Sequence, residues 1–441
     1  MKSVVILNSP IFKNTTDEHE EYLAPLGLGY IATYLEYNGF KVELIDCVKE
    51  RLGVDDIVNT IVHIAPDYVG INVFTQNYHL VKNILENIEI NCEYFIGGPA
   101  VKSIYEEILL WNINNNLSIV IGEGELILPD ILNGQCKESP IKELKNKKVY
   151  RVDNNSDYLP KDISSIHLNR KYFKKEIITN HYGDNEASII TSRGCAFDCA
   201  FCGGARSLNN NVDIRIRTEQ SVIEEINELL VLYTGIKSIR ILDDLFLRNS
   251  KSIDMASRIF GHYPSIEWRG MVHAISLVNS LDKVELLKQS NCKELFMGIE
   301  SGSQKIRNKI NKIGTLNDII SVATEILRNG IDLKGYFIYG FPDETIEDFE
   351  ATYELACKIM DISRNFKGVF RTSVFKFRPY HGTLLYKEIV AKKGEIPTCI
   401  QDEITNTLLD RNQFNFSSGN YSEVNDDVLN EFIIKTQNLV E

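Results

Sequence analysis

The stretch SRGCAFDCAFCGG, residues 192–204, is the strongest signal in the chain because it places three cysteines within eight residues: Cys195, Cys199 and Cys202. Three thiols spaced CxxxCxxC on one loop can converge on a single metal centre. A zinc site would need a fourth protein ligand close by, and the nearest histidines, His181 and His262, are not adjacent. Three thiolates suit a 4Fe–4S cluster with one iron left open, because thiolates are the usual cluster ligands.

Strand and helix patterns alternate on both sides of this loop. The strand candidates are 188–191, 238–242, 266–270, 294–299, 333–339 and 369–375. The helical patterns between them are 219–233, 251–260, 281–289, 303–310 with 317–329, and 345–360. Six βα units predict a partial TIM-like barrel, two units short of eight, with its active site at the C-terminal ends of the strands.

The first 135 residues show a second, separate alternation. Their strand candidates are 4–7, 42–45, 68–73, 94–96 and 118–121, and their helical patterns are 27–38, 54–64, 79–90, 101–111 and 125–133. Such spacing predicts right-handed βαβ units in a doubly wound, Rossmann-like or flavodoxin-like parallel sheet. We therefore expect an α/β chain with four parts: a sheet domain at 1–138, a linker at 139–185, the barrel at 186–380 and a C-terminal appendage at 381–441.

Composition narrows the classes of protein to consider. The 441 residues are 44% hydrophobic and 25% charged, which is typical of globular proteins. The formal charge of −13 disfavours nucleic-acid binding and docking on anionic membranes. No stretch approaches the ~18 apolar residues of a membrane helix, so a cytoplasmic protein is expected. The six cysteines outside the loop have no close spacing and read as packed thiols: Cys47, Cys92, Cys136, Cys292, Cys357 and Cys399.

The cysteine loop, with the aromatic Phe201 before its third Cys and its place after the first barrel strand, resembles the radical S-adenosylmethionine (SAM) superfamily. The resemblance implies that the three cysteines hold a 4Fe–4S cluster and that the segment Gly203–Gly204 binds the methionyl amino group of SAM. The family usually has an acidic residue next, whereas this chain reads Ala205-Arg206.

Further SAM contacts follow from the same resemblance. Phe201 and the segment Ile338, Tyr339 and Gly340 would border the adenine, and Glu300 and Ser301 would contact the ribose or methionine end. Reductive cleavage of SAM would then give a 5′-deoxyadenosyl radical, which the protein must position against one substrate hydrogen. The residues that relay protons or radicals stay open.

Small and hydroxyl-bearing residues follow the strands of the N-terminal domain, at the edge where doubly wound sheets bind ligands. No GxGxxG follows the first strand, which disfavours a dinucleotide site. With a radical SAM barrel behind it, the pattern of PLGL, GG and GEGE resembles the cobalamin-binding domain of the cobalamin-dependent branch. The implied contacts are Asn8, Leu26, Gly27, Thr75, Gln76, Gly97, Gly98, Gly122, Glu123, Gly124 and Glu125.

The lower cobalt ligand is missing from the sequence. A DxHxxG box would fall near Asp46, where the chain reads DCVKERLG without His. The resemblance thus implies cobalamin without a histidine ligand, its lower face open or occupied by another group. A domain that keeps the fold but holds no cobalamin stays an alternative.

The resemblance as a whole implies a C-methyltransferase that transfers a methyl group from methylcobalamin to a substrate radical. A cobalamin-using rearrangement or cyclisation, a methylthiotransferase acting on transfer RNA, and a cluster-bearing sensor remain alternatives. The expected partners are a small-molecule or natural-product substrate and a flavodoxin- or ferredoxin-like electron donor. We expect neither nucleic-acid binding nor membrane insertion, and the sequence does not identify the substrate or the oligomeric state.

Overall fold

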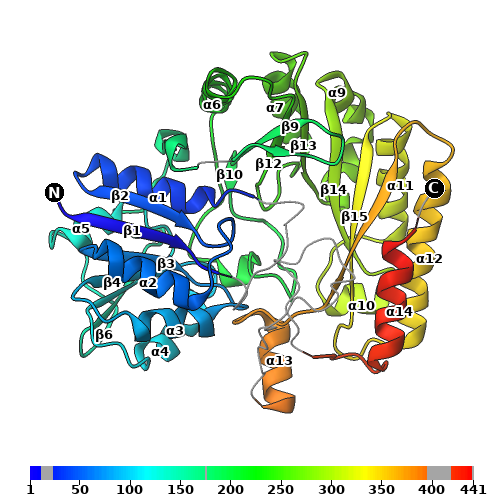
Figure 1. Ribbon diagram of the computed structural model, residues 1–441. Coiled ribbons are helices and arrows are strands. Elements are labelled where there is room, and N and C mark those ends of the chain that lie inside the picture. Colours follow the sequence, from blue (N-terminus) through cyan, green and yellow to red (C-terminus); the bar gives the residue numbers. More distant parts are fainter. Residues whose placement is uncertain (11–22, 174–175, 395–418, 440–441) are drawn as a thin grey trace.

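The computed structural model describes residues 1–10, 23–173, 176–394 and 419–439, which form two α/β bodies joined side by side (Figure 1). Each body is built on a mainly parallel sheet of seven strands. Cys399 lies outside the described residues, as does much of the expected C-terminal appendage. Within the described ranges, no helix combines the length and the apolar composition needed to cross a bilayer.

The first sheet has the order β2-β1-β3-β4-β5-β7-β6 and confirms the doubly wound fold. Its parallel strands are β1 (Ser3–Asn8), β2 (Lys41–Asp46), β3 (Tyr68–Asn72), β4 (Glu93–Gly97), β5 (Leu117–Ile121) and β7 (Lys147–Arg151). The central strand β3 reads YVGIN and is buried along its whole length, as expected for a parallel strand covered on both faces.

Helices cover both faces of this sheet because its strand side chains alternate between them. One face packs on α1 (Leu26–Tyr37) and α5 (Ile127–Leu132). The other packs on α2 (Val54–Ile64), α3 (Tyr78–Asn87) and α4 (Val101–Leu109). The helix that connects β1 to β2 lies on one face of the sheet, and the helix that connects β2 to β3 lies on the other. The direction in which strands are added therefore reverses between β1 and β3, and ligands bind at this point in such folds.

The segment 139–185, expected to be a linker, contains two strands that extend the first sheet. The strand β7 pairs in parallel with β5 and buries Val149 and Tyr150, and β6 (Lys142–Leu144) pairs antiparallel at the edge. Every residue of β6 is exposed and two of its three are charged, which is how natural proteins protect sheet edges. The polar, charged composition that suggested a connector therefore belongs to an edge of the first sheet.

The second sheet confirms the six-unit partial barrel. Its parallel strands are β9 (Asn185–Ile189), β12 (Ser238–Ile241), β13 (Glu267–Val272), β14 (Cys292–Glu300), β15 (Asp332–Tyr339) and β16 (Phe370–Lys376). The short strand β8 (Ile178–Thr179) adds an antiparallel edge. The outer face is covered by α6 (Glu219–Leu232), α7 (Ser250–Gly261), α8 (Ala274–Leu277), α9 (Val284–Gln289), α11 (Leu316–Arg328) and α12 (Ile346–Ser363), while α10 (Gln304–Lys309) lies at the strand ends.

Two helices follow the barrel. Figure 1 shows α13 (Leu384–Lys393) projecting from the body and α14 (Asp426–Gln437) lying along α12. The side chains of Leu429, Phe432 and Ile433 on α14 join the barrel core, and the Tyr339 hydroxyl lies 2.7 Å from Thr436 Oγ1. The last helix is thus part of the barrel wall rather than a separate unit.

Candidate functional site

The floor of the half-barrel is closed by buried ion pairs. Arg269 donates to Glu186 at 2.7 Å and to Glu294 at 3.0 Å, and Arg371 donates to Glu294 at 2.8 Å. Burial opposes ionisation of Glu294, but Arg371 and Arg269 hold its pKa below the ordinary value. These paired charges fill the end of the half-barrel opposite its C-terminal mouth.

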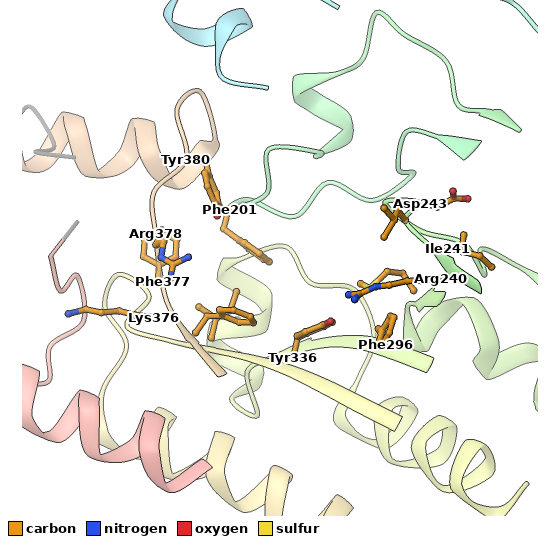
Figure 2. Close-up of a pocket in the computed structure, with 14 residues that line it drawn as sticks. Phe201, Arg240, Ile241, Asp243, Phe296, Tyr336, Lys376, Phe377, Arg378 and Tyr380 are labelled. Carbon is orange, nitrogen blue, oxygen red and sulfur yellow. The ribbon is translucent and has the colours of Figure 1, made fainter. Parts of the chain in front are cut away.

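Above the floor lies a first cavity of about 370 Å³ inside the barrel. In Figure 2, Arg240, Phe296 and Asp243 lie to one side, Phe377, Arg378 and Tyr380 to the other, and Phe201 and Tyr336 between them. Phe201 and Ile338, two of the expected adenine contacts, both line it. The cavity is mainly aromatic and apolar, as binding sites for flat organic ligands are.

Asp243 fixes the start of the cysteine loop to the barrel. Its buried carboxylate accepts hydrogen bonds from the backbone of Thr191 at 2.7 Å and of Ser192 at 3.1 Å, and from the Thr191 hydroxyl at 2.6 Å. Ser192 and Arg193 then form β10, which pairs with β11 (Arg215–Ile216). The loop therefore leaves the barrel in a fixed direction.

The loop itself is held by backbone contacts on two further sides. Ala200 donates to the Ile310 carbonyl at 2.9 Å and accepts from Leu385 of α13 at 3.0 Å. Gly204 N–H donates to the Cys202 sulfur at 3.3 Å. Burial raises the pKa of all three loop thiols, that of Cys202 to about 12.

Three cations surround these thiols and oppose that effect of burial. Lys312 lowers the pKa of Cys199 and Cys195, and Arg248 lowers that of Cys195. Lys102 comes from α4 of the other body, and its Nζ donates to the Gly203 carbonyl at 3.0 Å and to Asn209 at 2.8 Å. Positive charge favours thiolates, so the donor set fits an iron–sulfur cluster.

Two features of this loop depend on the tertiary structure. Among the described residues, no three His, Cys, Asp or Glu side chains converge closely enough for a single metal ion. Lys102 lies about a hundred positions before the cysteines, and nothing in the sequence marks it as a neighbour. Only the packing of the two bodies brings it there.

The other expected SAM contacts lie at the ends of β14 and β15. Glu300 has a positive φ of 66° and pairs with Lys312 at 3.0 Å. Ser301 is buried, with its hydroxyl 3.1 Å from that of Thr352 on α12, and Tyr339 points outward to Thr436 because neighbouring strand residues face opposite sides. Gly340 N–H donates to Glu344 at 2.7 Å. Ser301 and Tyr339 thus present backbone, not side chain, to the mouth.

A second cavity of about 560 Å³ lies between the carboxyl edges of the two sheets. Of the expected cobalamin contacts, nine line it: Asn8, Gly27, Gln76, Gly97, Gly98, Gly122, Glu123, Gly124 and Glu125. From the barrel come Ile190, Ser192, Arg193, Gly194, Leu242 and Asp244. The other two expected contacts do not line the cavity. Leu26 packs in the hydrophobic core, and the Thr75 hydroxyl lies 3.1 Å from His381 Nδ1.

The cavity wall fits a large ligand with amide groups, as cobalamin has. A Cβ built on Gly27 meets no atom within 4 Å, so this helix leaves open space on the cavity side. The buried Gln76 lines the same cavity, and its Oε1 has no hydrogen-bond partner among the described residues. An acceptor left unpaired at a buried position needs a donor, which a corrin side-chain amide supplies.

Glu123 and Glu125 of the GEGE segment have a further role that the sequence did not reveal. Arg193, two residues before Cys195, pairs with Glu123 at 2.6 Å and with Glu125 at 2.8 Å, and Arg215 also pairs with Glu123. Burial opposes ionisation of Glu123, but the two arginines keep its pKa below the ordinary value. We name Arg193, Arg215, Glu123 and Glu125 the interface clamp.

No histidine is among the described residues that line the second cavity. Asp46, where the missing box would begin, ends β2 and accepts from Asn8 Nδ2 at 2.8 Å and from the backbone of Lys49 at 3.1 Å. From this loop, Val48 lines the second cavity.

Comparisons with known proteins identify the domains that carry these two cavities. The family model of the radical SAM superfamily matches residues 189–356, and that of the B12-binding domain matches residues 15–132. An uncharacterized methyltransferase, PH0819, from Pyrococcus horikoshii is 32% identical over 384 residues, which cover 83% of this chain and 78% of the relative.

Two solved structures share the fold at low identity. The cobalamin-dependent SAM radical enzyme OxsB superposes with a TM-score of 0.66 at 16% identity, covering 91% of this chain and 63% of OxsB. The radical SAM methyltransferase TsrM from Kitasatospora setae, solved with cobalamin and a 4Fe–4S cluster, superposes with a TM-score of 0.66 at 18% identity, covering 89% of this chain and 78% of TsrM. The chain therefore belongs to the cobalamin-dependent family of radical SAM enzymes, whose cofactors are a 4Fe–4S cluster, SAM and cobalamin.

Proposed function

We propose that the chain is a cobalamin-dependent radical SAM C-methyltransferase. The observation that carries this proposal is the second cavity, because one continuous space is lined both by the glycine-rich edge of the first sheet and by the residues that open the cysteine loop. The first cavity shares Leu242 with the second, so that a methyl carrier in the second and a radical source in the first can act on one substrate carbon. The matching relative PH0819 and the structure of TsrM are both named methyltransferases.

Each group of residues has a role in this proposal. Cys195, Cys199 and Cys202 ligate the cluster. Phe201, Gly203, Gly204, Glu300, Ser301, Ile338, Tyr339 and Gly340 contact SAM, and the nine cavity residues named above contact cobalamin. When bound, the cluster supplies the electron that cleaves SAM to a 5′-deoxyadenosyl radical, and cobalamin carries the methyl group.

The chain's own residues orient these groups and exclude water. The floor ion pairs of Arg269, Arg371, Glu186 and Glu294 close the barrel, and Asp243 sets the direction of the cysteine loop. The substrate, a small molecule or natural product, would enter the first cavity beside Phe296 and Tyr336. A flavodoxin- or ferredoxin-like protein would deliver the electron in the cytoplasm.

The proposal is tested without knowing the substrate. Anaerobically reconstituted protein is given SAM and a chemical reductant, with or without cobalamin, and deoxyadenosine and S-adenosylhomocysteine are measured. We expect both products, and S-adenosylhomocysteine only when cobalamin is present, because that product reports methyl transfer out of SAM. Bound corrinoid with deoxyadenosine but no S-adenosylhomocysteine would favour a non-methylating rearrangement. About four irons per chain without bound corrinoid would contradict any cobalamin chemistry.

A further inference from the structure

Asp244 is a carboxylate at the cysteine loop for which the proposed function has no role. It follows β12, lines the second cavity and is exposed on the cavity wall. The backbone N–H of Gly194, directly before Cys195, is near enough to lower the pKa of this carboxyl. Its Oδ1 lies 3.8 Å from the position of a Cβ built on Gly204, and that position is 3.6 Å from the Cys202 sulfur. The carboxylate thus lies beside both ends of the loop.

The neighbouring carboxylates already have partners. Asp243 is saturated by Thr191 and Ser192. Glu300 pairs with Lys312. Glu123 and Glu125 pair with Arg193 in the interface clamp. Among the described residues, Asp244 has no ion pair within 4.0 Å. Desolvation by the surrounding protein raises its pKa, and the charges of Lys102 and Arg248 oppose that rise.

The glycine segment supplies no carboxylate of its own. Ala205 and Arg206 follow Gly204, and the Arg206 guanidinium donates to the Val212 carbonyl at 2.6 Å, away from the cavity. One backbone acceptor of the segment, the Gly203 carbonyl, is taken by Lys102. A cationic ligand group at this segment therefore depends on a carboxylate from another element.

We propose that Asp244 binds the ammonium group of SAM. The inference rests on the family's use of SAM but not on methyl transfer. An ammonium at the cysteine loop would lie close to Lys102 and Arg248, and an unpaired positive charge there would be unfavourable. A charge-assisted hydrogen bond to Asp244 removes that repulsion and fixes the methionyl end beside Gly204. A carboxylate that is exposed on the cavity and has no ion pair is suited to this role.

The test compares the affinity of SAM with that of an analogue that lacks the α-amino group. Full-length protein reconstituted with the cluster is titrated anaerobically with the cluster oxidised, so that SAM is not cleaved, and binding is read by equilibrium dialysis. We expect wild type to bind SAM at least tenfold more tightly than the analogue, a difference of about 1.4 kcal/mol. The Asp244→Asn variant, which keeps the size of the side chain but removes its charge, should bind both equally.

Two further variants distinguish charge from structure. Asp244→Glu keeps the charge and should retain part of the discrimination. Asp213→Asn removes an exposed carboxylate outside both cavities and should leave the wild-type ratio. Iron content and circular dichroism report folding, and the ratio is measured within the loaded fraction. An unchanged ratio in Asp244→Asn overturns the proposal, as does an Asp244→Glu variant equal to Asp244→Asn. Because no turnover is required, these results are independent of whether S-adenosylhomocysteine forms.

Discussion

The two sheets end at one cavity, but their carboxyl edges have different chemistry. The first edge contributes glycines, namely Gly97, Gly98, Gly122 and Gly124, and amide or small side chains. The second contributes thiols, carboxylates and arginines, with Cys195, Asp244 and Arg193 within a few residues of the strand ends. The glycines of the first edge leave room for a large ligand. The second edge holds its ligands through thiolate coordination and charged side chains.

This difference predicts that damage to one edge will spare the other cofactor. A side chain added to the glycine edge fills space and acts on cobalamin. A side chain removed from the cysteine loop takes away a bond and acts on iron. The clamp between the edges should affect stability more than either cofactor.

The largest effect is expected at the cysteine loop. Replacing Cys195, Cys199 or Cys202 by Ala should abolish deoxyadenosine production and remove most of the iron, because two thiolates do not retain the cluster. Iron is measured after anaerobic reconstitution. Cys136→Ala, a half-buried thiol in the other body, is the matched control and should keep wild-type iron. Wild-type iron and deoxyadenosine in any of the three loop variants would refute the ligand assignment.

The next effect is expected at the glycine edge. Gly27→Leu places a side chain in open cavity space and should reduce bound corrinoid below a tenth of wild type while iron stays unchanged. The fold should not suffer, because replacing a helical Gly gains up to about 1 kcal/mol of helix propensity. Gly261→Leu, at the end of α7, also enters open space but lies far from the cavity and serves as control. Corrinoid absorbance of the Gly27→Leu protein at the wild-type level would contradict the cavity assignment.

A third effect concerns the interface clamp. Arg193→Met leaves Glu123 and Glu125 without one of their cations and should lower the free energy of unfolding by about 2 kcal/mol, less than a fully buried pair costs, because Arg193 and Glu123 are 18% exposed. Urea unfolding of the apoprotein measures it. Arg258→Met breaks an exposed pair with Glu219 and should cost less than about 1 kcal/mol. Equal losses in the two variants would show that the clamp does not stabilise the interface.

The smallest effect is a pH dependence at the mouth of β15. Burial raises the pKa of Glu344 to about 8, although the backbone of Phe341 and Gly340 donates to it. The folded protein therefore keeps this proton up to pH 8, while the unfolded chain releases it near pH 4.5. The stabilising contribution of the protonated group is complete below pH 4.5 and is lost as pH rises towards 8.

The measurement is the unfolding free energy of wild type and Glu344→Gln at pH 6 and pH 7. Relative to the variant, wild type should lose on the order of 1 kcal/mol over this pH unit. Gln keeps the acceptor for Gly340 and Phe341 but does not titrate. Parallel pH profiles of the two proteins would show that Glu344 is already ionised in the folded state.

Much of the architecture is readable from local patterns. The apolar runs and helix periods of the chain predict both sheets, since strand and helix periods depend on neighbours a few residues away. The sequence did not predict β6 and β7, because they are polar and short, and it is the pairing of β7 with β5 and of β6 with β7 that makes them strands. The sequence also did not predict that Leu26 and Thr75 would point away from the second cavity, because a motif position does not say which side chain faces the ligand.

By itself, the sequence determined the fold class of both bodies, the family and the expected cluster ligands, because strand periodicity and cysteine spacing are local properties of the chain. The tertiary structure decided what stands around those ligands. Lys102 reaches the Gly203 carbonyl from the other body, and Arg193 joins the loop to Glu123. Asp244 lies on the cavity wall with no ion pair to any residue that the structure describes. These arrangements depend on how two separately folded sheets pack edge to edge, which no short stretch of sequence encodes.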